Sequence, residues 1–403
     1  MLLIRVYLPL AFGYFLSYFF RNANAIIEQD LVAELSLSAS SLGLLTSAYF
    51  ISFAAFQLPL GLLLDRFGPR RTESTLLIFA ALGATLFALA DGLTGLIIGR
   101  LLIGFGVSAC LMAAFKAYVM WFPPEKLPMI NGLQMVAGGL GALSATAPLQ
   151  WALGWTDWRG IFWALALATV GASIFLWTVH PERPAEGEPE SLEKQWSGLK
   201  SVMTSPVFWS IAPLTMFSQA AQLAIQGLWI KPWMRDVLGY DAQTAANLLF
   251  WMTGTMILGF LGLGSLTARI SRQTGLQPMQ IALITMIAFM VVQGFMVLEW
   301  TTLATPLLLS FSFFATSGIL PYAALSQRFP KTLAGRVNTL LNLMVFVCAF
   351  IVQWGIGALI DLWPAPQEGL YAPEGYQVSF GILLGAQLLA LVWAVRTRAV
   401  QKS

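Results

Sequence analysis

The sequence predicts an all-α membrane protein with twelve transmembrane helices in two pseudo-symmetric six-helix bundles. Of its 403 residues, 58% are hydrophobic and 10% are charged, and the mean hydropathy is +0.74. Soluble domains carry about 25% charged residues, so this composition excludes an ordinary soluble protein. Apolar segments long enough to cross a bilayer, which takes about 20 residues, recur along the whole chain and are joined mostly by short polar turns.

Twelve apolar segments of spanning length follow one another along the chain. They lie near residues 6–28, 40–64, 74–92, 95–120, 128–150, 160–180, 207–231, 243–267, 278–298, 302–325, 337–360 and 377–396. Loop charges set their orientation, because cytoplasmic loops are enriched in Lys and Arg. If both termini are cytoplasmic, the basic loops fall inside, while Arg159, Lys231 and Arg235 fall outside. We therefore expect a multi-pass inner-membrane protein with cytoplasmic N and C termini.

One long polar connection divides the segments six and six. It follows His180 and is rich in Pro, Glu and Gly, a composition typical of a partly flexible linker. We predict an N-terminal bundle of residues 1–180, a cytoplasmic linker of residues 181–205 and a C-terminal bundle of residues 206–403. A weak internal repeat supports this division, since the stretch 264–274 follows the eighth segment as the stretch 61–71 follows the second.

The sequence offers no constellation for catalysis, metal binding or nucleic acid binding. Cys110 and Cys348 lie far apart in apolar segments, where they act as small buried residues, and His180 is the single histidine. No nucleophile–base pair or nucleotide-binding loop is present, so we expect neither an enzyme nor a cofactor. The net charge of +3 is spread over short loops and does not indicate nucleic acid. The expected partners are a small-molecule substrate and the bilayer, with protons left open.

The stretch GLLLDRFGPRR carries the most specific pattern in the chain. It forms a tight, charged turn between the second and third segments, and its pattern G-x-L-x-D-R-x-G-x-R-R resembles the signature loop of the major facilitator superfamily. The resemblance extends to Arg100 and the small residues after it in the fourth segment, and in part to Gly138–Gly141 and Pro148 in the fifth. It implies a twelve-helix secondary transporter that works by alternating access and is usually monomeric. It also implies a conformational latch made by Gly61, Asp65, Arg66, Gly68, Arg70 and Arg71.

The first segment carries a charge at membrane depth, which is costly and indicates function by default. Tyr14, Tyr18 and Arg21 share one helical face, with Asn24 beside them. A guanidinium fork suits carboxylate, phosphate or sulfonate groups, and the two phenols supply adjoining apolar surface. We predict that these four residues bind substrate. The alternative is that Arg21 reaches outward or pairs with an acidic residue at the outer end of the helix.

The seventh segment carries a row of amides on one helical stripe that ends in an aromatic ring: Gln219, Gln222, Gln226 and Trp229. Amides facing lipid would leave their donors unsatisfied. We therefore predict that this row lines the substrate cavity and hydrogen-bonds substrate or water. Hydrogen bonding between helices is the alternative.

Coupling residues are harder to assign, because we find no Asp or Glu in the middle of any predicted span. The nearest candidates are Glu28 and Asp30 at the outer end of the first segment, together with Arg100. An Arg21–Glu28 pair would exchange protonation against anion binding, whereas solvated loop acids are the plain alternative. Arg100 has two alternative roles. It takes part in proton movement, or it forms a structural bond to Asp91 or to a backbone carbonyl. Lys116 fits the inner mouth of a cavity or a side chain that reaches outward to the interface.

The residues together predict a secondary active transporter for a small or amphiphilic organic solute, with an anion favoured over a cation by Arg21. Two alternatives remain. A multidrug/proton antiporter is suggested by the partial motif in the fifth segment, although a cation exporter without a buried acid would be unusual. A lysolipid transporter would require a lateral opening that sequence does not reveal.

Overall fold

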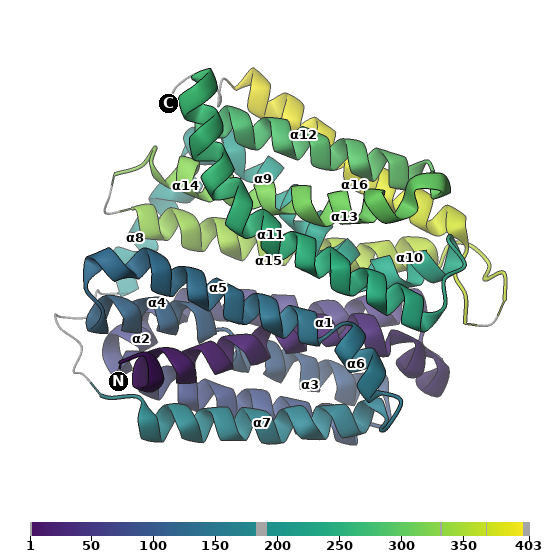
Figure 1. The fold of residues 1–403 in the computed structure, drawn as a ribbon, viewed down its shortest axis with the longest axis horizontal. Coiled ribbons are helices and arrows are strands. Elements are labelled where there is room, and N and C mark those ends of the chain that lie inside the picture. The colour runs from purple at the N-terminus through teal and green to yellow at the C-terminus, as the bar shows by residue number, and fades with distance from the viewer. Residues whose placement is uncertain (1, 183–191, 331–332, 368, 398–403) are drawn as a thin grey trace. The chain divides into compact units, whose positions relative to one another are not determined.

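The computed structural model describes residues 2–182, 192–330, 333–367 and 369–397, and it is helical almost throughout (Figure 1). Each of the twelve predicted segments is helical over most of its length, and the described residues contain no strand. The predicted all-α class is confirmed. The orientation of the termini stays a prediction, and residues 183–191 of the predicted linker lie outside the described part of the chain.

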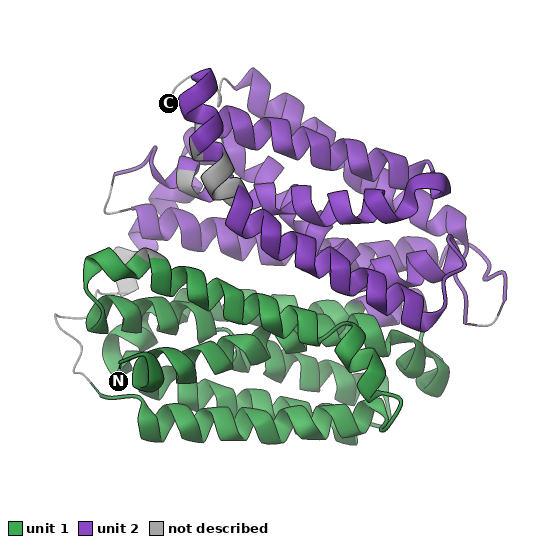
Figure 2. Cartoon of the chain, viewed as in Figure 1, with its two compact units in different colours: residues 1–37, 44–191 green, residues 38–43, 192–403 purple. Residues whose placement is uncertain are grey.

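The helices form two compact units (Figure 2). Unit 1 comprises residues 1–37 and 44–191, and unit 2 comprises residues 38–43 and 192–403. Unit 1 contains the following elements: η1 (Leu3–Tyr7), α1 (Leu8–Leu35), α2 (Ala39–Leu89), α3 (Leu93–Gly106), α4 (Cys110–Trp121), η2 (Pro124–Lys126), α5 (Leu127–Ser144), α6 (Ala147–Ala152) and α7 (Trp158–Val179). The first residues of α2 cluster with unit 2.

Unit 2 contains an additional amphipathic helix, α8 (Leu192–Met203), before its membrane segments. The other elements are α9 (Pro206–Ala224), η3 (Ile225–Trp229), α10 (Ile230–Asp236), α11 (Ala242–Thr274), α12 (Pro278–Val297), η4 (Thr301–Leu303), α13 (Ala304–Ala315), η5 (Thr316–Ile319), α14 (Leu320–Ser326), α15 (Ala334–Ile360) and α16 (Pro373–Arg396). The predicted linker, residues 181–205, therefore contains the whole of α8.

The charged turn is a kink and not an open loop. Helix α2 runs through both the second and the third predicted segments and is interrupted at Gly68, whose φ of 76° and ψ of 168° are not helical. A side chain would be strained at this positive φ, which glycine adopts freely. Pro69 follows at the start of the next helical stretch. Proline is tolerated there because a backbone N–H at the first helical position has no carbonyl acceptor within the helix. The kink brings the charged motif to one end of unit 1.

Several spans are broken rather than continuous. The fourth segment divides at residues 107–109 between α3 and α4, and the seventh passes through one π-helical turn, η3. Among the described residues, nine helices are long and apolar enough to cross a membrane. Many of their large apolar side chains are exposed, including Leu167 (72%) and Leu389 (75%). Such surfaces are unfavourable in water and fit contact with lipid.

Small residues let the helices of unit 1 approach closely. A Cβ added to Gly141 of α5 would overlap the carbonyl of Phe15 in α1, and one added to Gly106 of α3 would overlap the backbone of Ala80 in α2. Close backbone approach at small residues is a common basis of helix packing in membranes. The first of these contacts fixes α1, the helix that carries Arg21, against α5.

Candidate functional site

Three aromatic rings surround the guanidinium of Arg21. Its Cζ lies 4.5 Å from the ring centroid of Tyr18, 5.5 Å from that of Phe53 and 5.7 Å from that of Tyr49. Tyr49 and Phe53 stack on each other with centroids 5.9 Å apart, so α2 supplies one face of this setting. Cations are attracted to aromatic faces, more strongly when they are desolvated. The guanidinium is therefore held in place while its charge is retained.

The two tyrosines of α1 are packed, and one of them is almost fully buried. Tyr14 is 4% exposed, meets Tyr18 edge to face at 4.9 Å and points its hydroxyl toward the sulfur of Met135 in α5 at 3.9 Å. Helix α5 leaves room for them at Gly138, where a Cβ would contact both rings. The sequence prediction thus placed Tyr14, Tyr18 and Arg21 together correctly, but it missed Tyr49 and Phe53.

Arg100 lies behind the same aromatic layer. It is 1% exposed, donates from Nη1 to the backbone carbonyl of Phe20 at 2.7 Å, and its Cζ lies 5.3 Å from the ring centroid of Tyr49. Of the two structural pairings anticipated for Arg100, this is the one with a carbonyl. Asp91 instead lies 3.8 Å from Arg159. Arg100 therefore fixes the backbone of the residue that precedes Arg21.

The other residues assigned to the first segment separate into buried and exposed groups. Asn24 is buried and donates to Thr46 Oγ1 of α2 at 3.1 Å, which makes it a bond between helices. Glu28 is 1% exposed, whereas Asp30 is exposed. The plain alternative of solvated loop acids therefore applies to Asp30 and not to Glu28.

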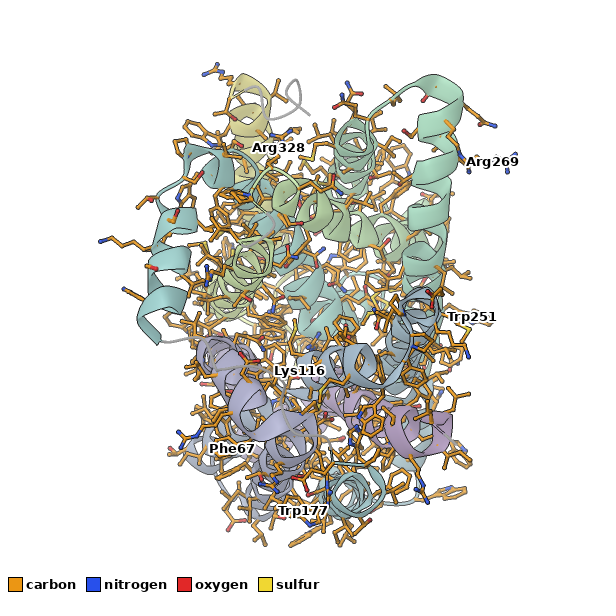
Figure 3. All side chains as sticks on the ribbon, turned by 90° about the vertical axis from the view of Figure 1, so that its left-hand side faces the viewer. Phe67, Lys116, Trp177, Trp251, Arg269 and Arg328 are labelled. Atoms are coloured by element: carbon orange, nitrogen blue, oxygen red, sulfur yellow. The ribbon has the colours of Figure 1, made fainter. Side chains whose placement is uncertain are left out.

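The aspartate of the motif is paired with Lys116. Nζ of Lys116 lies 2.5 Å from Oδ1 of Asp65 and 2.8 Å from the carbonyl oxygen of Leu64, so α4 is fastened to α2 just before the kink. Figure 3 labels Lys116 and Phe67 in the view from this end of the molecule. Both side chains of the pair remain partly exposed, at 26% and 42%. Lys116 thus has a specific partner inside unit 1.

The motif arginines reach the end of α7. Arg70 lies 3.4 Å from Glu182, Arg71 pairs with the other oxygen of the same carboxylate, and the Arg70 Cζ stacks 5.2 Å from the ring centroid of Trp177. Arg66 is exposed beside Phe67. The exposed Gly61 makes no close approach, since a Cβ there would meet no atom within 4 Å. The turn is therefore a local ion-pair network.

In unit 2, the row of glutamines divides among several neighbouring elements. Gln219 packs against Gly318 of η5, Gln222 donates to Met256 Sδ of α11 at 3.5 Å, and Gln226 accepts a hydrogen bond from Ser312 of α13 at 3.1 Å. Gln226 is 5% exposed, while the first two are half-buried. The π turn at Ile225–Trp229 changes the helical spacing that placed these residues on one stripe.

Trp229 is packed inside unit 2. It is fully buried, and its indole Nε1 donates to the carbonyl of Gln353 in α15 at 2.9 Å. Its ring also lies 6.2 Å from that of Tyr371. Buried tryptophans normally find such a partner for the N–H, so the contacts of Trp229 are those of a core residue.

A buried carboxylate lies where the sequence pattern predicted only a charged turn. Glu73 of α2 is 0% exposed, and it stands just before the predicted span 74–92, whereas the expectation was only that no acidic residue lies in the middle of a span. It follows Arg70 and Arg71 so closely that the pattern assigned it to the charged turn, and the predicted span began at residue 74. Helix α2 resumes directly after the kink at Gly68, so Glu73 belongs to the helix, where it is buried. Within the described residues, no group of acidic, Cys or His side chains has the arrangement of a metal site.

Comparison with known proteins gives relatives that are named as transporters of anions. The chain is 25% identical over 275 residues to the hexuronate transporter of Escherichia coli K12, covering 62% of each chain. It is 23% identical over 371 residues to the hexuronate transporter of Bacillus subtilis, covering 86% of this chain and 85% of that one. A further B. subtilis protein, the uncharacterized transporter YybO, is 31% identical over 170 residues. That alignment covers 42% of this chain and 39% of YybO, so the chain spans less than two thirds of some relatives it matches.

Solved structures of the same fold cover nearly the whole chain. A bacterial homologue of the human lysosomal transporter Spinster, in an inward-facing and unoccupied conformation, superposes with a TM-score of 0.75 at 17% identity. That superposition covers 98% of this chain and 97% of the other. A D-xylose–proton symporter gives a TM-score of 0.74 at 14% identity, covering 99% of both chains. At these identities the likeness establishes the fold.

A sequence model of the Major Facilitator Superfamily matches residues 10–353. Together with relatives named as transporters, this match confirms the expectations of a multi-pass membrane protein and of a transport protein rather than an enzyme. The residues that carry the signature turn, the fourth-segment arginine and the glycines of the fifth segment all lie inside the matched range. Because that range includes more than half of the 403 residues, the chain belongs to the Major Facilitator Superfamily.

Proposed function

We propose that this protein is a secondary active transporter that carries a small organic anion, of the hexuronate class, across the inner membrane. The observation that carries the proposal is the aromatic setting of Arg21 in α1. A hexuronate combines one carboxylate with a sugar ring. A guanidinium offers a planar fork to the carboxylate, and the neighbouring rings offer surface to the sugar.

The relatives support the same chemistry independently. Proteins named hexuronate transporters occur in E. coli and B. subtilis, and another match is the galacturonate transporter of Dickeya chrysanthemi, 26% identical over 261 residues. Their printed substrates are anions of the kind that Arg21 suits. We therefore propose Arg21, Tyr14 and Tyr18 as the anion-binding group, with Asn24 holding α1 in place.

We propose that transport proceeds by alternating access of an N-terminal bundle, residues 1–180, and a C-terminal bundle, residues 206–403. The fold supports this proposal, since twelve-helix transporters of this kind work by rocking two halves about a central site. In this scheme Gln219, Gln222 and Gln226 of the C-terminal bundle hydrogen-bond substrate or water, and the motif from Gly61 to Arg71 acts as the latch. We expect the working unit to be a monomer.

Ligand-induced thermal stabilisation of the purified protein tests the anion site. A ligand that binds only the folded state raises the melting temperature. We expect galacturonate to stabilise the wild type, and we expect Arg21→Ala to remove that shift. Arg5→Ala is the matched control, because it removes the same charge from the exposed start of the same helical segment. A shift that survives Arg21→Ala would contradict the assignment of Arg21.

A further inference from the structure

The strongest unexplained feature of unit 1 is Glu73, a carboxylate buried without a charge partner. Its exposure is 0%, and apart from the weakly donating thiol of Cys110 neither carboxylate oxygen has a hydrogen-bond partner. In the described part of the chain, no Lys, Arg or His nitrogen forms an ion pair with it. A lone carboxylate in an apolar interior costs several kcal/mol, and such a group takes up a proton instead of remaining charged.

The surroundings of Glu73 are built from three helices. Gly13 of α1 faces it so closely that a Cβ there would overlap Oε1 of Glu73 and would lie 3.7 Å from Sγ of Cys110 in α4. Cys110 lies within the apolar span Leu93–Trp121, six residues before Lys116, which pairs with Asp65 of the charged turn. The absence of a side chain at residue 13 is what allows the carboxyl group to reach the backbone of α1.

The other titratable and polar groups around Glu73 are neutral or engaged elsewhere. Tyr118 of α4 donates to Gln134 at 2.6 Å and meets the ring of Tyr7 at 6.2 Å. From α7, Ser173 donates to the carbonyl of Ser74, the next residue in α2, at 2.7 Å. Arg70, one turn before Glu73, is directed to Glu182 and Trp177. The thiol of Cys110 is a weak donor and does not balance a negative charge.

The contact is connected to the anion site through α1. Gly13 and Arg21 are eight residues apart on this helix, about 12 Å along its axis. Any movement of α1 that follows the substrate at Arg21 therefore also changes how closely Gly13 covers Glu73. A proton and an anion that favour the same arrangement of α1 must strengthen each other's binding, because such coupling is reciprocal.

We propose that Glu73 is the proton-binding residue of the transport cycle. The carboxyl group is protonated in the arrangement described here. When α1 withdraws at Gly13, water reaches Glu73, the proton passes from a carboxyl oxygen to that water, and the hydrated carboxylate remains. Protonation reverses the step, and no other bond changes. This proposal rests on the proposed transport function and deepens it, since it assigns the coupling role to Glu73 instead of to Glu28, Asp30 or Arg100.

Infrared difference spectroscopy tests the protonation state without requiring a substrate. At neutral pH we expect the carbonyl band of a protonated carboxylic acid in the wild type, its loss in Glu73→Gln, and its retention in Glu125→Gln, which removes an exposed acid from the η2 turn. A band that Glu73→Gln leaves unchanged would overturn the proposal. Glu73→Asp, which keeps an acid at this position, is expected to retain a shifted band and guards against misfolding of the glutamine variant.

Reconstituted vesicles test whether this proton takes part in transport, with galacturonate as the probe. One unit of pH difference is worth about tenfold in accumulation for each coupled proton. We expect wild-type and Glu125→Gln vesicles to show that dependence, and we expect Glu73→Gln vesicles to lose it while still exchanging galacturonate at equal pH. A Glu73→Gln protein that still responds to the gradient would refute the role of Glu73. Wild-type vesicles that do not transport galacturonate at all would refute the hexuronate assignment, while the infrared result would still decide the protonation of Glu73.

Discussion

The α1 face of unit 1 and the α9–η3 row of unit 2 were both predicted to bind substrate, yet they are built differently. The first contains two buried or half-buried cations, Arg21 and Arg100, which share the ring of Tyr49. The second contains neutral amides, and two of them bond to side chains of neighbouring helices. Charge is concentrated in the first region, while the second supplies amides, two of which already have partners.

In the proposed transporter, the two regions contribute differently to substrate binding. Aromatic faces attract a cation without removing its charge, so the rings around Arg21 position a charged group for an anion. An amide that already donates or accepts within the protein contributes to packing first. We therefore expect substitutions on the α1 face to change substrate affinity strongly, and those on the amide row to change it weakly.

The largest expected effect follows from removing the Arg21 charge. Hydrogen bonds to charged groups contribute about 1.5–3 kcal/mol. Arg21→Ala should therefore lower kcat/KM for galacturonate by about tenfold to a hundredfold. Arg21→Lys should retain part of the activity, since it keeps the charge but loses the planar fork. Uptake in reconstituted vesicles is the measurement. Equal activities for the lysine and alanine variants would indicate that the charge of Arg21 has no role in binding.

The next largest effect is expected at Arg100, the second cation of unit 1 beside the ring of Tyr49. Arg100→Met removes the donor to the carbonyl of Phe20, and an unsatisfied buried acceptor costs about 1–3 kcal/mol. We expect a clear loss of thermal stability, with a smaller loss of affinity than for Arg21→Ala. Arg159→Met is the control, because its pair with Glu34 is partly exposed and such pairs contribute about 0–1 kcal/mol. A stable Arg100→Met protein with lost binding would assign Arg100 to the ligand directly.

A substitution in the charged turn is expected to have an effect of intermediate size, because it alters neither the α1 face nor the amide row. Asp65→Asn removes the partner of Lys116 at a partly exposed site, so stability should fall by no more than about 1 kcal/mol. We expect membrane insertion and galacturonate binding to be retained and the transport rate to fall. Binding and uptake measured on the same preparation separate these effects. A normal transport rate would remove Asp65 from the proposed latch.

The amide row should respond weakly. Gln226→Leu removes the hydrogen bond from Ser312, and a typical bond contributes about 0.5–1.5 kcal/mol. We expect a modest decrease in stability and less than a tenfold change in galacturonate affinity. The double variant with Ser312→Ala should be no worse than Gln226→Leu alone, because both remove the same bond. A loss of affinity as large as that of Arg21→Ala would show that the amide row and the α1 face contribute equally to substrate binding.

The smallest expected effect is a pH dependence at the end of α1. Hydrogen bonds from the Trp158 indole and from Arg159 lower the pKa of Glu34 below its usual value. A carboxyl group with a depressed pKa stabilises the fold above its unfolded-state pKa, and that contribution is lost as the pH falls through the folded-state pKa. Melting temperatures of wild type and Glu34→Gln should therefore differ at neutral pH and converge in acid. A difference that grows on acidification would contradict this linkage.

Sequence alone determined the all-α class, the twelve apolar segments, the family and the most prominent intramembrane cation. These features depend on local composition and on helical spacing, because a bilayer requires long apolar helices with satisfied backbones. Arg21 was identifiable for the same reason, since a charge inside such a segment is conspicuous in one dimension.

The tertiary structure decided which groups meet. It placed Tyr49 and Phe53 of α2 around Arg21, paired Lys116 with Asp65, and enclosed Trp229 in the core of unit 2. It also buried Glu73, which lies in the helical stretch that resumes after Gly68, earlier than hydropathy indicated. Hydropathy records how apolar a segment is on average. The burial of one carboxylate depends on where the helix resumes and on the close approach that Gly13 permits, and both are properties of the packed helices.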